Sequence, residues 1–405
     1  MKDVNLVRLS EEIKEFEEYL APTTFETRSR HDLFQTIRSI ALQNYPEATV
    51  EPFGSFETQL LLPSSDIDLN ISTDDGIKPQ TILKKISKCL RQYGYMQPVF
   101  RATVPVIKFC EYKSALNADI TAQNNVISSK RTLQWMEEYP ELKPLFLVLK
   151  HALLGIRFEH DPNYEVLSTV RNGLASYALI CLITHYLKYN GDTSEKDGKE
   201  DKDFSKKRLG MLLIGFLKFY STFDFDTKGL TFYTSEGYFD RRDGAFDPKC
   251  LNGTIAIENP DDPSANVARA TRTAKQFQAA LGWMHVQLNT RIESDTFQRS
   301  LLEKVILVES HPSNTPRKNL TKYQFPLKYL SVEDLGASNL PSVDPYLFAN
   351  NAARKRKQSY IDRDDGDNIG RSSNENSRPK KRKKEKRGQS HSQERGNGRR
   401  FKRSR

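Results

Sequence analysis

The sequence is poor in cysteine and has no long hydrophobic run. Four of its 405 residues are cysteine: Cys89, Cys110, Cys181 and Cys250. Their separations match neither the CxxC pairs of a zinc site nor the dense pattern of a disulfide-stapled secreted domain. The most apolar stretch, residues 174–187, is interrupted by Ser176 and His185 and is shorter than the ~18–20 residues of a membrane span. We therefore expect reduced cysteines in the cytosol or nucleus, no built-in zinc module and no segment that enters a membrane.

The excess of basic over acidic residues is confined to the C-terminal part of the chain, and the rest of the chain lacks it. Lys and Arg total 62 against 52 Asp and Glu, a formal net charge of +10. Residues 351–405 hold 20 of the basic and 7 of the acidic side chains, a net of +13, which leaves −3 for residues 1–350. Clustered basic charge indicates an anionic partner, so we expect the tail to raise affinity for RNA without regard to base sequence. Residues 379–387 within it are typical of a nuclear-import signal, which predicts a nuclear or nucleolar location.

Hydrophobic periodicity divides the rest of the chain into helical and mixed regions. It predicts helices over residues 9–20 and 24–44, before any strand. From residue 48 it predicts one helix, over 79–93, among four strand-like stretches: ATVEPF, DIDLNI, VPVIKFCEY and LNADITA. After residue 125 the helical spacing returns, with helices expected over 142–156, 174–189, 208–220 and 265–288.

This pattern predicts an α+β protein in four parts. Residues 1–44 form N-terminal helices that pack with the helical domain, and residues 45–125 form a catalytic α/β domain. Residues 126–340 form a mostly helical domain, with a solvated insertion near 190–204. Residues 341–405 form a disordered basic tail.

The segment FGSFETQLLLPSSDIDLNI, residues 53–71, carries the strongest chemical signal. Asp66 and Asp68 stand two apart on a strand-like stretch, so both carboxylates leave the same face, as half of a divalent-metal site requires. The chain has five Asp-x-Asp triplets, and the other four are solvated polar pairs in our interpretation. What distinguishes the first is Gly54-Ser55, because a Gly-Ser turn can direct backbone N–H groups and a hydroxyl at phosphate oxygens.

Asp119 in LNADITA is the candidate for a third acid. It lies on another strand-like run about 50 residues later, between the apolar Ala118 and Ile120. The residues alone leave two possibilities open: a third metal ligand, or an exposed strand residue opposite a lysine.

The order of several motifs resembles one enzyme family. FGSFETQLLLPSSDIDLNI, VPVIKF, NADI, RNGLASYAL and IENPDDPSANVAR follow each other as in the poly(A) polymerase and terminal uridylyltransferase family, over about residues 10–290. The first motif is most similar to the TRAMP-type poly(A) RNA polymerases, the Trf or DNA polymerase sigma group. The resemblance implies a polymerase-β-like nucleotidyltransferase domain followed by a mostly helical PAP-associated domain.

The resemblance also implies a role for each matching residue. Asp66, Asp68 and Asp119 would be catalytic and hold two Mg²⁺ (or Mn²⁺) ions, with ATP as substrate. Gly54 and Ser55 would bind the β- and γ-phosphates. The other nucleotide contacts would come from Lys150 and Ser176 (triphosphate), Tyr177 (base stacking), Asn124 (ribose 2′-OH), and Asp262 and Asn266 (adenine edge). Without the family, Lys150 would be a lysine at a helix edge, Tyr177 a core residue and Asn124 a turn residue.

Two departures from the family pattern concern the base-reading loop. The sequence has Asn259-Pro260 where the family usually has Asp-Pro, and Ala265-Asn266 where it has Asn-Asn or His-Asn. A histidine at position 265 would mark uridylyl-transferring members, so Ala265 argues against UTP without selecting ATP. A second family lysine is Leu154 here.

The expected activity is template-independent addition of AMP to RNA 3′ ends, in nuclear RNA surveillance, processing and decay. The alternatives are a terminal uridylyltransferase or mixed-nucleotide transferase, and an inactive RNA-binding scaffold on the same fold. The chain contains no RNA-recognition module with aromatic RNP motifs. By analogy with the group it resembles, we expect a zinc-knuckle RNA-binding protein and an RNA helicase as partners, in a TRAMP-like complex.

Overall fold

The computed structural model describes residues 2–74, 76–168, 172–191, 202–243, 254–294, 300–306 and 327–336. The expectations for the tail, for most of the 190–204 insertion and for Cys250 lie outside these residues. The described elements build two hydrophobic cores, one around a five-stranded sheet and one among helices. No helix in the described ranges has the length and apolar character needed to cross a membrane.

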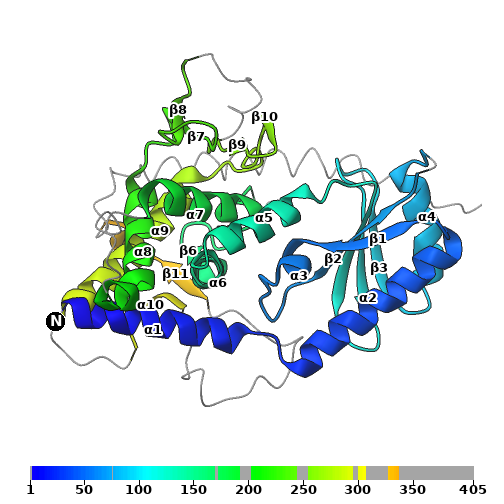
Figure 1. Ribbon diagram of the computed structural model, residues 1–405, viewed down its shortest axis with the longest axis horizontal. Coiled ribbons are helices and arrows are strands. Elements are labelled where there is room, and N and C mark those ends of the chain that lie inside the picture. Colours follow the sequence, from blue (N-terminus) through cyan, green and yellow to red (C-terminus); the bar gives the residue numbers. More distant parts are fainter. Residues whose placement is uncertain are drawn as a thin grey trace, which may run out of the picture. The chain divides into compact units, whose positions relative to one another are not determined.

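The sheet body comprises residues 24–122 (Figure 1). Its helices are α2 (Thr24–Asn44), α3 (Gly54–Thr58) and α4 (Pro79–Leu90). Its strands are β1 (Thr49–Phe53), β2 (Ile67–Ser72), β3 (Gly94–Val99), β4 (Val106–Glu111) and β5 (Asn117–Ala122). They lie in the order β1-β2-β5-β4-β3, with β2 and β5 parallel and every other neighbouring pair antiparallel.

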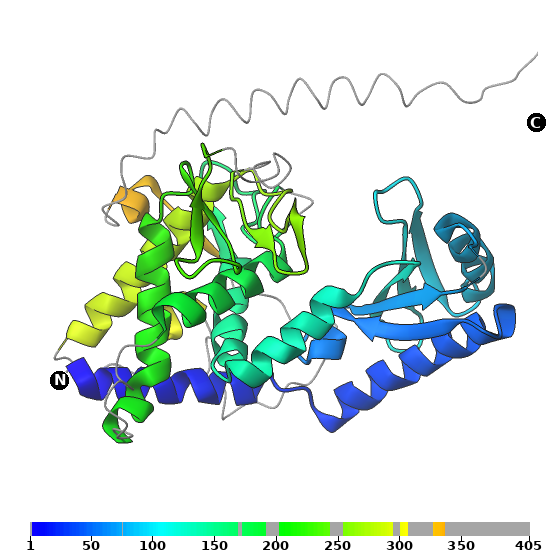
Figure 2. The same cartoon turned by 45° about the horizontal axis from the view of Figure 1, so that its top comes forward.

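Alternation along the central strands explains how the sheet buries one face and leaves the other for polar groups. Ile67, Leu69 and Ile71 of β2 are fully buried, and Ile120 of β5 lies beside them in the same core. This face is covered by α2 and α4, which lie together on the side of the sheet away from α5 (Figure 2). Because strand side chains alternate, the residues between the buried ones, Asp68 included, point to the other face.

The helical body contains α1 (Lys2–Leu20) and the elements from residue 127 onward. Its other helices are α5 (Ile127–Glu138), α6 (Leu142–Gly155), α7 (Ser176–Asn190), α8 (Lys202–Thr222), α9 (Ala274–Glu293), α10 (Glu303–Ile306) and α11 (Val332–Gly336). Three small sheets complete it: β6 (Ile156–Phe158) with β11 (Lys328–Leu330), β7 (Lys228–Leu230) with β8 (Tyr238–Asp240), and β9 (Glu258–Asn259) with β10 (Asp262–Asn266). Helices α6 and α7 are buried almost all round, as their near-continuous apolar sequences predict.

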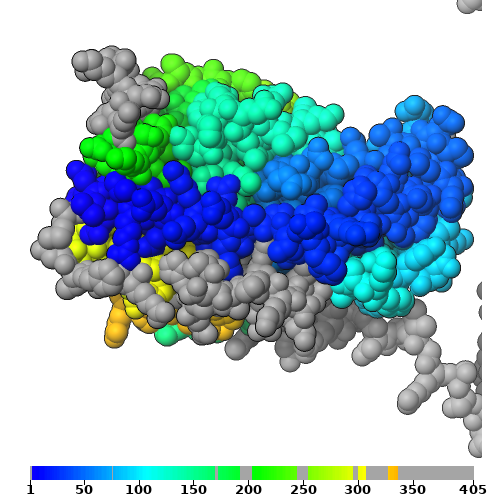
Figure 3. Space-filling model, turned by 60° about the horizontal axis from the view of Figure 1, so that its bottom comes forward, coloured from blue at the N-terminus to red at the C-terminus, as the bar shows by residue number. Residues whose placement is uncertain are grey.

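The two N-terminal helices belong to different cores, which corrects one expectation. Helix α1 packs on α8, α6 and α9. Helix α2 begins with a capping box formed by Thr23 and Glu26, and its apolar residues Leu33, Ile37 and Ile40 join the core of the sheet. The prediction that residues 1–44 pack as one unit with the helical domain is therefore wrong for α2. Both helices run along one face of the molecule (Figure 3).

The structure also contains one strand that was not predicted, and one helix that begins later than predicted. Strand β3, which the sequence pattern did not single out, forms the edge of the sheet. The helix expected from residue 265 begins at Ala274, because residues 262–266 pair with β9 and the buried Asn266 side chain bonds to the backbone of the loop.

Candidate active site

The acids identified in the sequence lie on the open face of the sheet, across its two central strands. Asp68 of β2 is the register partner of Asp119 of β5, so their side chains leave the sheet side by side. Asp66 stands directly before β2, and the Asn117 side chain of β5 acts to lower the pKa that burial raises. On the other side of Asp119, the Lys108 ammonium of β4 lies 3.0 Å from the Asp119 Oδ2 atom. Asp68, Asp119 and Lys108 thus form a row across three neighbouring strands.

Asp119 therefore has both of the neighbours that the sequence left as alternatives. It is opposite a lysine, as in the purely structural interpretation, and its side chain is about one quarter exposed. It also lies next to Asp68, as a third member of a metal site must. Asp119 thus lies between Asp68 on one side and Lys108 on the other.

Gly54 is held against Asp68 at the point where β1 ends and α3 begins. Phe53 is the register partner of Asp68, and Gly54 follows with a φ of +63°. A Cβ atom at Gly54 would lie 2.4 Å from Asp68 Oδ2, closer than side chains approach each other. The Gly54 N–H donates to Ser129 Oγ at 2.8 Å. This hydrogen bond uses the N–H that was expected to face phosphate, so within the Gly-Ser pair the phosphate-binding prediction rests on Ser55.

The electrostatics of the three acids show crowded negative charge. Burial raises the pKa of Asp68 to about 7, and the charges of Asp119 and Asp66 act in the same direction. Burial and Asp119 likewise raise the pKa of Asp66. Burial lowers the pKa of Lys150 on α6 to about 8, against the opposing effect of Asp68 and Asp66. Lys150 lines the same pocket as Gly54 and Ser55, which the interpretation as a helix-edge lysine did not require.

The donor set fits a hard divalent cation. Carboxylate oxygens are the ligands that Mg²⁺ and Mn²⁺ prefer, and three carboxylates against Lys108 and Lys150 leave one uncompensated negative charge. Across the described ranges, however, no three acidic, His or Cys side chains converge closely enough as they stand to surround one ion. The Asp119 carboxylate is instead paired with Lys108, at 3.0 Å.

A pocket beside the acids collects most of the predicted triphosphate-binding residues. Gly54, Ser55, Lys150, Ser176 and Tyr177 line it together. Three residues of α5 that the sequence analysis missed also line it: Ser128, Ser129 and Thr132. Their only signal in the sequence is a run of small hydroxyl residues, which is common at helix starts. The sheet body and the helical body each contribute to the pocket.

The residues predicted to contact the base and the ribose lie in different surroundings. The Tyr177 ring stacks on Trp135, with centroids 6.4 Å apart and planes 18° apart. Asn124 follows β5 in a turn, where its Oδ1 accepts from the Asn125 N–H. Asp262 is exposed at the start of β10. The predicted ribose and base contacts of Asn124 and Asp262 remain predictions.

Asn266 is buried in the loop, whereas a residue that reads adenine would have to present its side chain to the base. It is 3% exposed, its Oδ1 accepts from the N–H groups of Ile257 and Ala268, and its Nδ2 donates to the Ile255 carbonyl. The amide is thus committed to the backbone of the loop, and Asn266 positions that loop instead of presenting its side chain to a base.

Asp261, next to the predicted Asp262, is the acid that the structure places near Tyr177. Its carboxylate accepts from Arg131 of α5 at 3.0 and 2.5 Å, and its side chain is only 5% exposed. Burial raises the pKa of both Tyr177 and Tyr233, and the Asp261 charge acts in the same direction. The Arg131–Asp261 pair therefore fastens the 259–266 loop to α5, and sequence spacing could not reveal it because the two residues are 130 positions apart.

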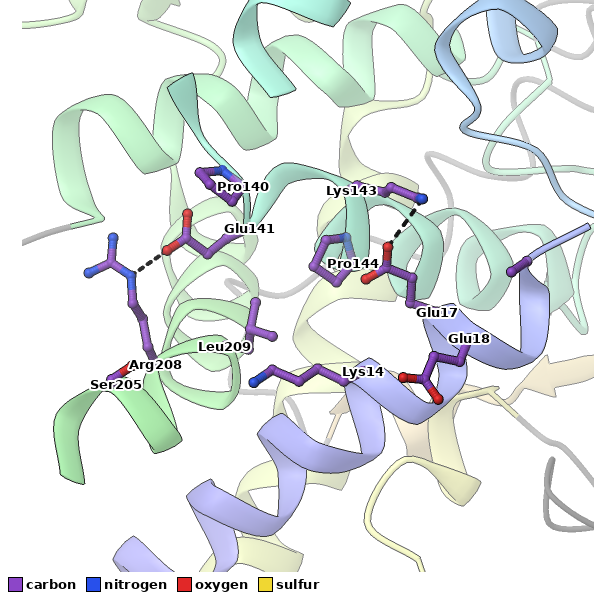
Figure 4. Close-up of a pocket in the computed structure, with 11 residues that line it drawn as sticks. Lys14, Glu17, Glu18, Pro140, Glu141, Lys143, Pro144, Ser205, Arg208 and Leu209 are labelled. Atoms are coloured by element: carbon purple, nitrogen blue, oxygen red, sulfur yellow. Dashed lines mark hydrogen bonds and ion pairs between the residues drawn. The ribbon is translucent and has the colours of Figure 1, made fainter. Parts of the chain in front are cut away.

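A second pocket, of about 540 Å³, lies among α1, α6 and α8 and contains none of the predicted site residues. Its charged groups are largely paired: Lys143 with Glu17 and Arg208 with Glu141 (Figure 4). Paired charges of both signs leave little net attraction for an anionic nucleotide. The chemistry predicted from the sequence therefore belongs to the smaller pocket beside Asp68.

Comparison with known protein families matches both bodies of the fold. The family described as "Poly(A) RNA polymerase, mitochondrial-like, central palm domain" matches residues 9–134. The family described as "Cid1 family poly A polymerase", the PAP-associated domain, matches residues 208–265. The first match covers the Gly-Ser turn and all three acids, and the second ends in β10.

Individual proteins are similar over most of this chain. Poly(A) RNA polymerase protein 1 of Eremothecium gossypii is 29% identical over 317 residues, which are 74% of this chain and 48% of that protein. A Drosophila melanogaster protein described as the inactive non-canonical poly(A) RNA polymerase protein Trf4-2 is 28% identical over 303 residues, 72% of this chain and 70% of that one. The chain thus spans about half the length of the first of these relatives.

A solved structure shares the fold. The polymerase core of TRAMP, described as an RNA surveillance complex, superposes with a TM-score of 0.63 at 27% identity, over 76% of this chain and 95% of that one. The prediction of a polymerase-β-like nucleotidyltransferase fold is confirmed by this likeness and by the match to the palm domain.

Proposed function

We propose that the chain is a template-independent poly(A) RNA polymerase, because it is similar over most of its length to poly(A) RNA polymerases and to the polymerase core of TRAMP. The reaction is transfer of AMP from ATP to the 3′ end of RNA, with release of pyrophosphate. The observation that carries the proposal is the register pairing of Asp68 with Asp119, with Gly54 against Asp68 and Lys150 in the adjoining pocket.

Each group of residues has a defined task in this reaction. Asp66, Asp68 and Asp119 would hold two Mg²⁺ or Mn²⁺ ions, which supply positive charge that neutralises the triphosphate and lowers the pKa of the attacking 3′-OH. Ser55, Lys150 and Ser176 bind the triphosphate from the pocket that they line. The Tyr177 ring offers the base a stacking surface supported from behind by Trp135.

Ala265 argues against UTP as the preferred substrate, although it does not itself select ATP. It replaces the histidine that would mark a uridylyl-transferring member, and it is only partly buried at the loop that Arg131 and Asp261 fasten. A terminal uridylyltransferase or a mixed-nucleotide transferase is the alternative within the same chemistry. The four nucleotides, offered separately, distinguish these activities.

The test is primer extension by the full chain with a labelled RNA oligonucleotide, Mg²⁺ and each NTP in turn. We expect extension with ATP, abolished in Asp66→Asn, Asp68→Asn. A matched control is Asp224→Asn, Asp226→Asn, a second Asp-x-Asp triplet, on the turn before β7 and remote from the predicted acids in sequence. Better extension with UTP than with ATP would overturn the substrate, and equal activity in both double variants would overturn the site.

An inactive RNA-binding scaffold is the second candidate, and two observations favour it. Asp119 is paired with Lys108, and a relative with 28% identity is described as inactive. The substitution Lys108→Ala frees Asp119 from this ion pair, yet primer extension stays absent if the chain is a scaffold. A chain that binds RNA but extends no primer, with or without a partner, supports the scaffold.

We infer from the likeness to the TRAMP polymerase core and to the Eremothecium gossypii poly(A) RNA polymerase protein 1 that the chain works on RNA in a similar surveillance complex. A zinc-knuckle RNA-binding protein and an RNA helicase are the partners we propose. The basic segment 379–387 supports a nuclear, including nucleolar, location. Co-purification from nuclear extract tests the partners, and a fluorescent fusion with this segment's lysines and arginines replaced by glutamine tests the location.

A further inference from the structure

The open face of the sheet continues beyond the acids onto β4 and β3 and carries exposed tyrosines. Along β4, Ile107 and Phe109 are buried while Lys108 and Cys110 face the open side. Tyr95 of β3 is the register partner of Cys110, and the Tyr112 N–H donates to the Tyr93 carbonyl just past the strand ends. We call Tyr93, Tyr95 and Tyr112 the tyrosine face. Their exposures are 40%, 67% and 71%.

The stability of the sheet does not explain why large aromatic side chains lie on its uncovered face. The buried side of the same strands is covered by α4, and removal of the tyrosine rings would leave that core intact. The segment that carries them, residues 91–117, contains four Lys or Arg side chains and a single acid, Glu111, and of the four cations Lys108 is paired with Asp119. Exposed aromatics among cations match a single-stranded nucleic acid, whose bases stack and whose phosphates are anionic.

We propose that the tyrosine face binds the RNA strand that leads to the 3′ end, by stacking its bases on Tyr95 and Tyr112. The inference rests on the proposed function and names the path of its substrate. The strand order determines the side: Gly54 and Ser55 border the acids at β1, so the triphosphate approaches from there. The acceptor strand therefore enters from the opposite side, across β4 and β3, which lies at the sheet edge (Figure 1).

The sheet spacing sets the nucleotide that reaches the tyrosines. Tyr95 is two strands across from β5 and two residues along from the Asp119 row, which at about 4.8 Å per strand and 3.4 Å per residue is about 12 Å. At about 3.4 Å per stacked nucleotide this distance corresponds to three to four nucleotides upstream of the 3′ end. Dinucleotides are too short to reach Tyr95, and oligonucleotides of six or more are long enough.

The test measures RNA binding to the full chain by fluorescence anisotropy, without ATP, using labelled A₂ and A₈ at 50 and 200 mM salt. We expect Tyr95→Ala and Tyr112→Ala each to weaken A₈ binding about tenfold at both salt concentrations, since stacking is not screened as phosphate contacts are. Binding of A₂ and the KM for ATP stay unchanged. Tyr329→Ala is the matched control, because Tyr329 is 43% exposed on β11, which pairs with β6 and not with the sheet.

Unchanged A₈ binding in the Tyr95, Tyr112 double variant, or an equal loss in Tyr329→Ala, would overturn the inference. A photo-crosslink from a 4-thiouridine placed four nucleotides from the 3′ end is a second measurement: it maps to residues 93–112 if the inference holds and elsewhere if it does not. Its failure is separable from that of the proposed function. If the chain binds A₈ through the tyrosines but extends no primer, only the proposed polymerase activity is refuted. If the chain extends primers and both tyrosine substitutions leave A₈ binding unchanged, only the proposed RNA path is refuted.

Discussion

Gly54→Ala is the substitution whose effect the structure defines most sharply. The new Cβ would lie 2.4 Å from Asp68 Oδ2, whereas ordinary contacts begin at 3.4 Å, so the carboxylate must move by about 1 Å. A displacement of 1 Å in a reacting group costs about 100-fold in rate. The backbone adds strain of about 1–2 kcal/mol, because Gly54 has a left-handed φ of +63° that an L-residue adopts reluctantly.

A second glycine separates these two effects. Gly76 has nearly the same φ, +64°, but no atom lies within 4 Å of the Cβ that alanine would add. We expect both variants to unfold about 1–2 kcal/mol more easily in urea. Only Gly54→Ala should lower kcat for AMP addition by about 100-fold, with little change in the KM for RNA. The two are compared by single-turnover primer extension beside equilibrium unfolding.

Two results would refute the reasoning. If Gly54→Ala keeps full kcat, then either Asp68 is not a reacting group or its carboxylate is free to move without cost. If Gly76→Ala loses activity to the same extent, then backbone strain and not the approach to Asp68 is what matters.

Three further predictions concern the helical body. Burial lowers the pKa of both His151 and His185 to about 4, so both stay neutral in the folded state while the unfolded chain takes up protons below about pH 6.5. Each histidine should therefore cost up to about 3 kcal/mol of stability between pH 6.5 and pH 4, whereas the raised pKa values of Asp66 and Asp68 act in the opposite direction. Urea unfolding of the Asp66→Asn, Asp68→Asn variant isolates the histidine effect, and a flat profile in that variant would contradict their burial. Arg131→Ala leaves the buried Asp261 carboxylate without its cation and should cost about 2 kcal/mol while raising the KM for ATP, both partly restored by the added substitution Asp261→Asn. Asn266→Ala strips two buried N–H groups of their acceptor and should cost about 2–3 kcal/mol and lower activity with every NTP equally; a selective loss with ATP would show that it reads the base after all.

The part of the site on the sheet could be predicted because it depends on strand periodicity. Asp66 and Asp68 share a face by the period of two, and the buried Ile67 and Leu69 between and beside them fix which face that is. Asp119 could be named from its own alternating strand. That it is the register partner of Asp68 depends on how β2 and β5 align, which no local pattern specifies.

The features that could not be predicted all involve contacts between distant segments. The pattern of α2 shows which face is apolar but not whether a sheet or a helix covers it, and so α2 was assigned to the wrong core. Asn266 looks like any polar loop residue until its three backbone partners are known. The Arg131–Asp261 pair likewise joins two elements that only the folded chain brings together.

The strand order of the sheet also has a consequence for how the chain folds. Strands β3, β4 and β5 follow each other closely and pair as antiparallel neighbours, so they can associate early and locally. Strand β2 must pair in parallel with β5 across about 50 intervening residues, which is entropically the more costly closure. Asp68 and Asp119 meet only in that closure. We therefore expect Asp68 and Asp119 to come together only after the β3–β5 meander, which carries the tyrosine face, has formed.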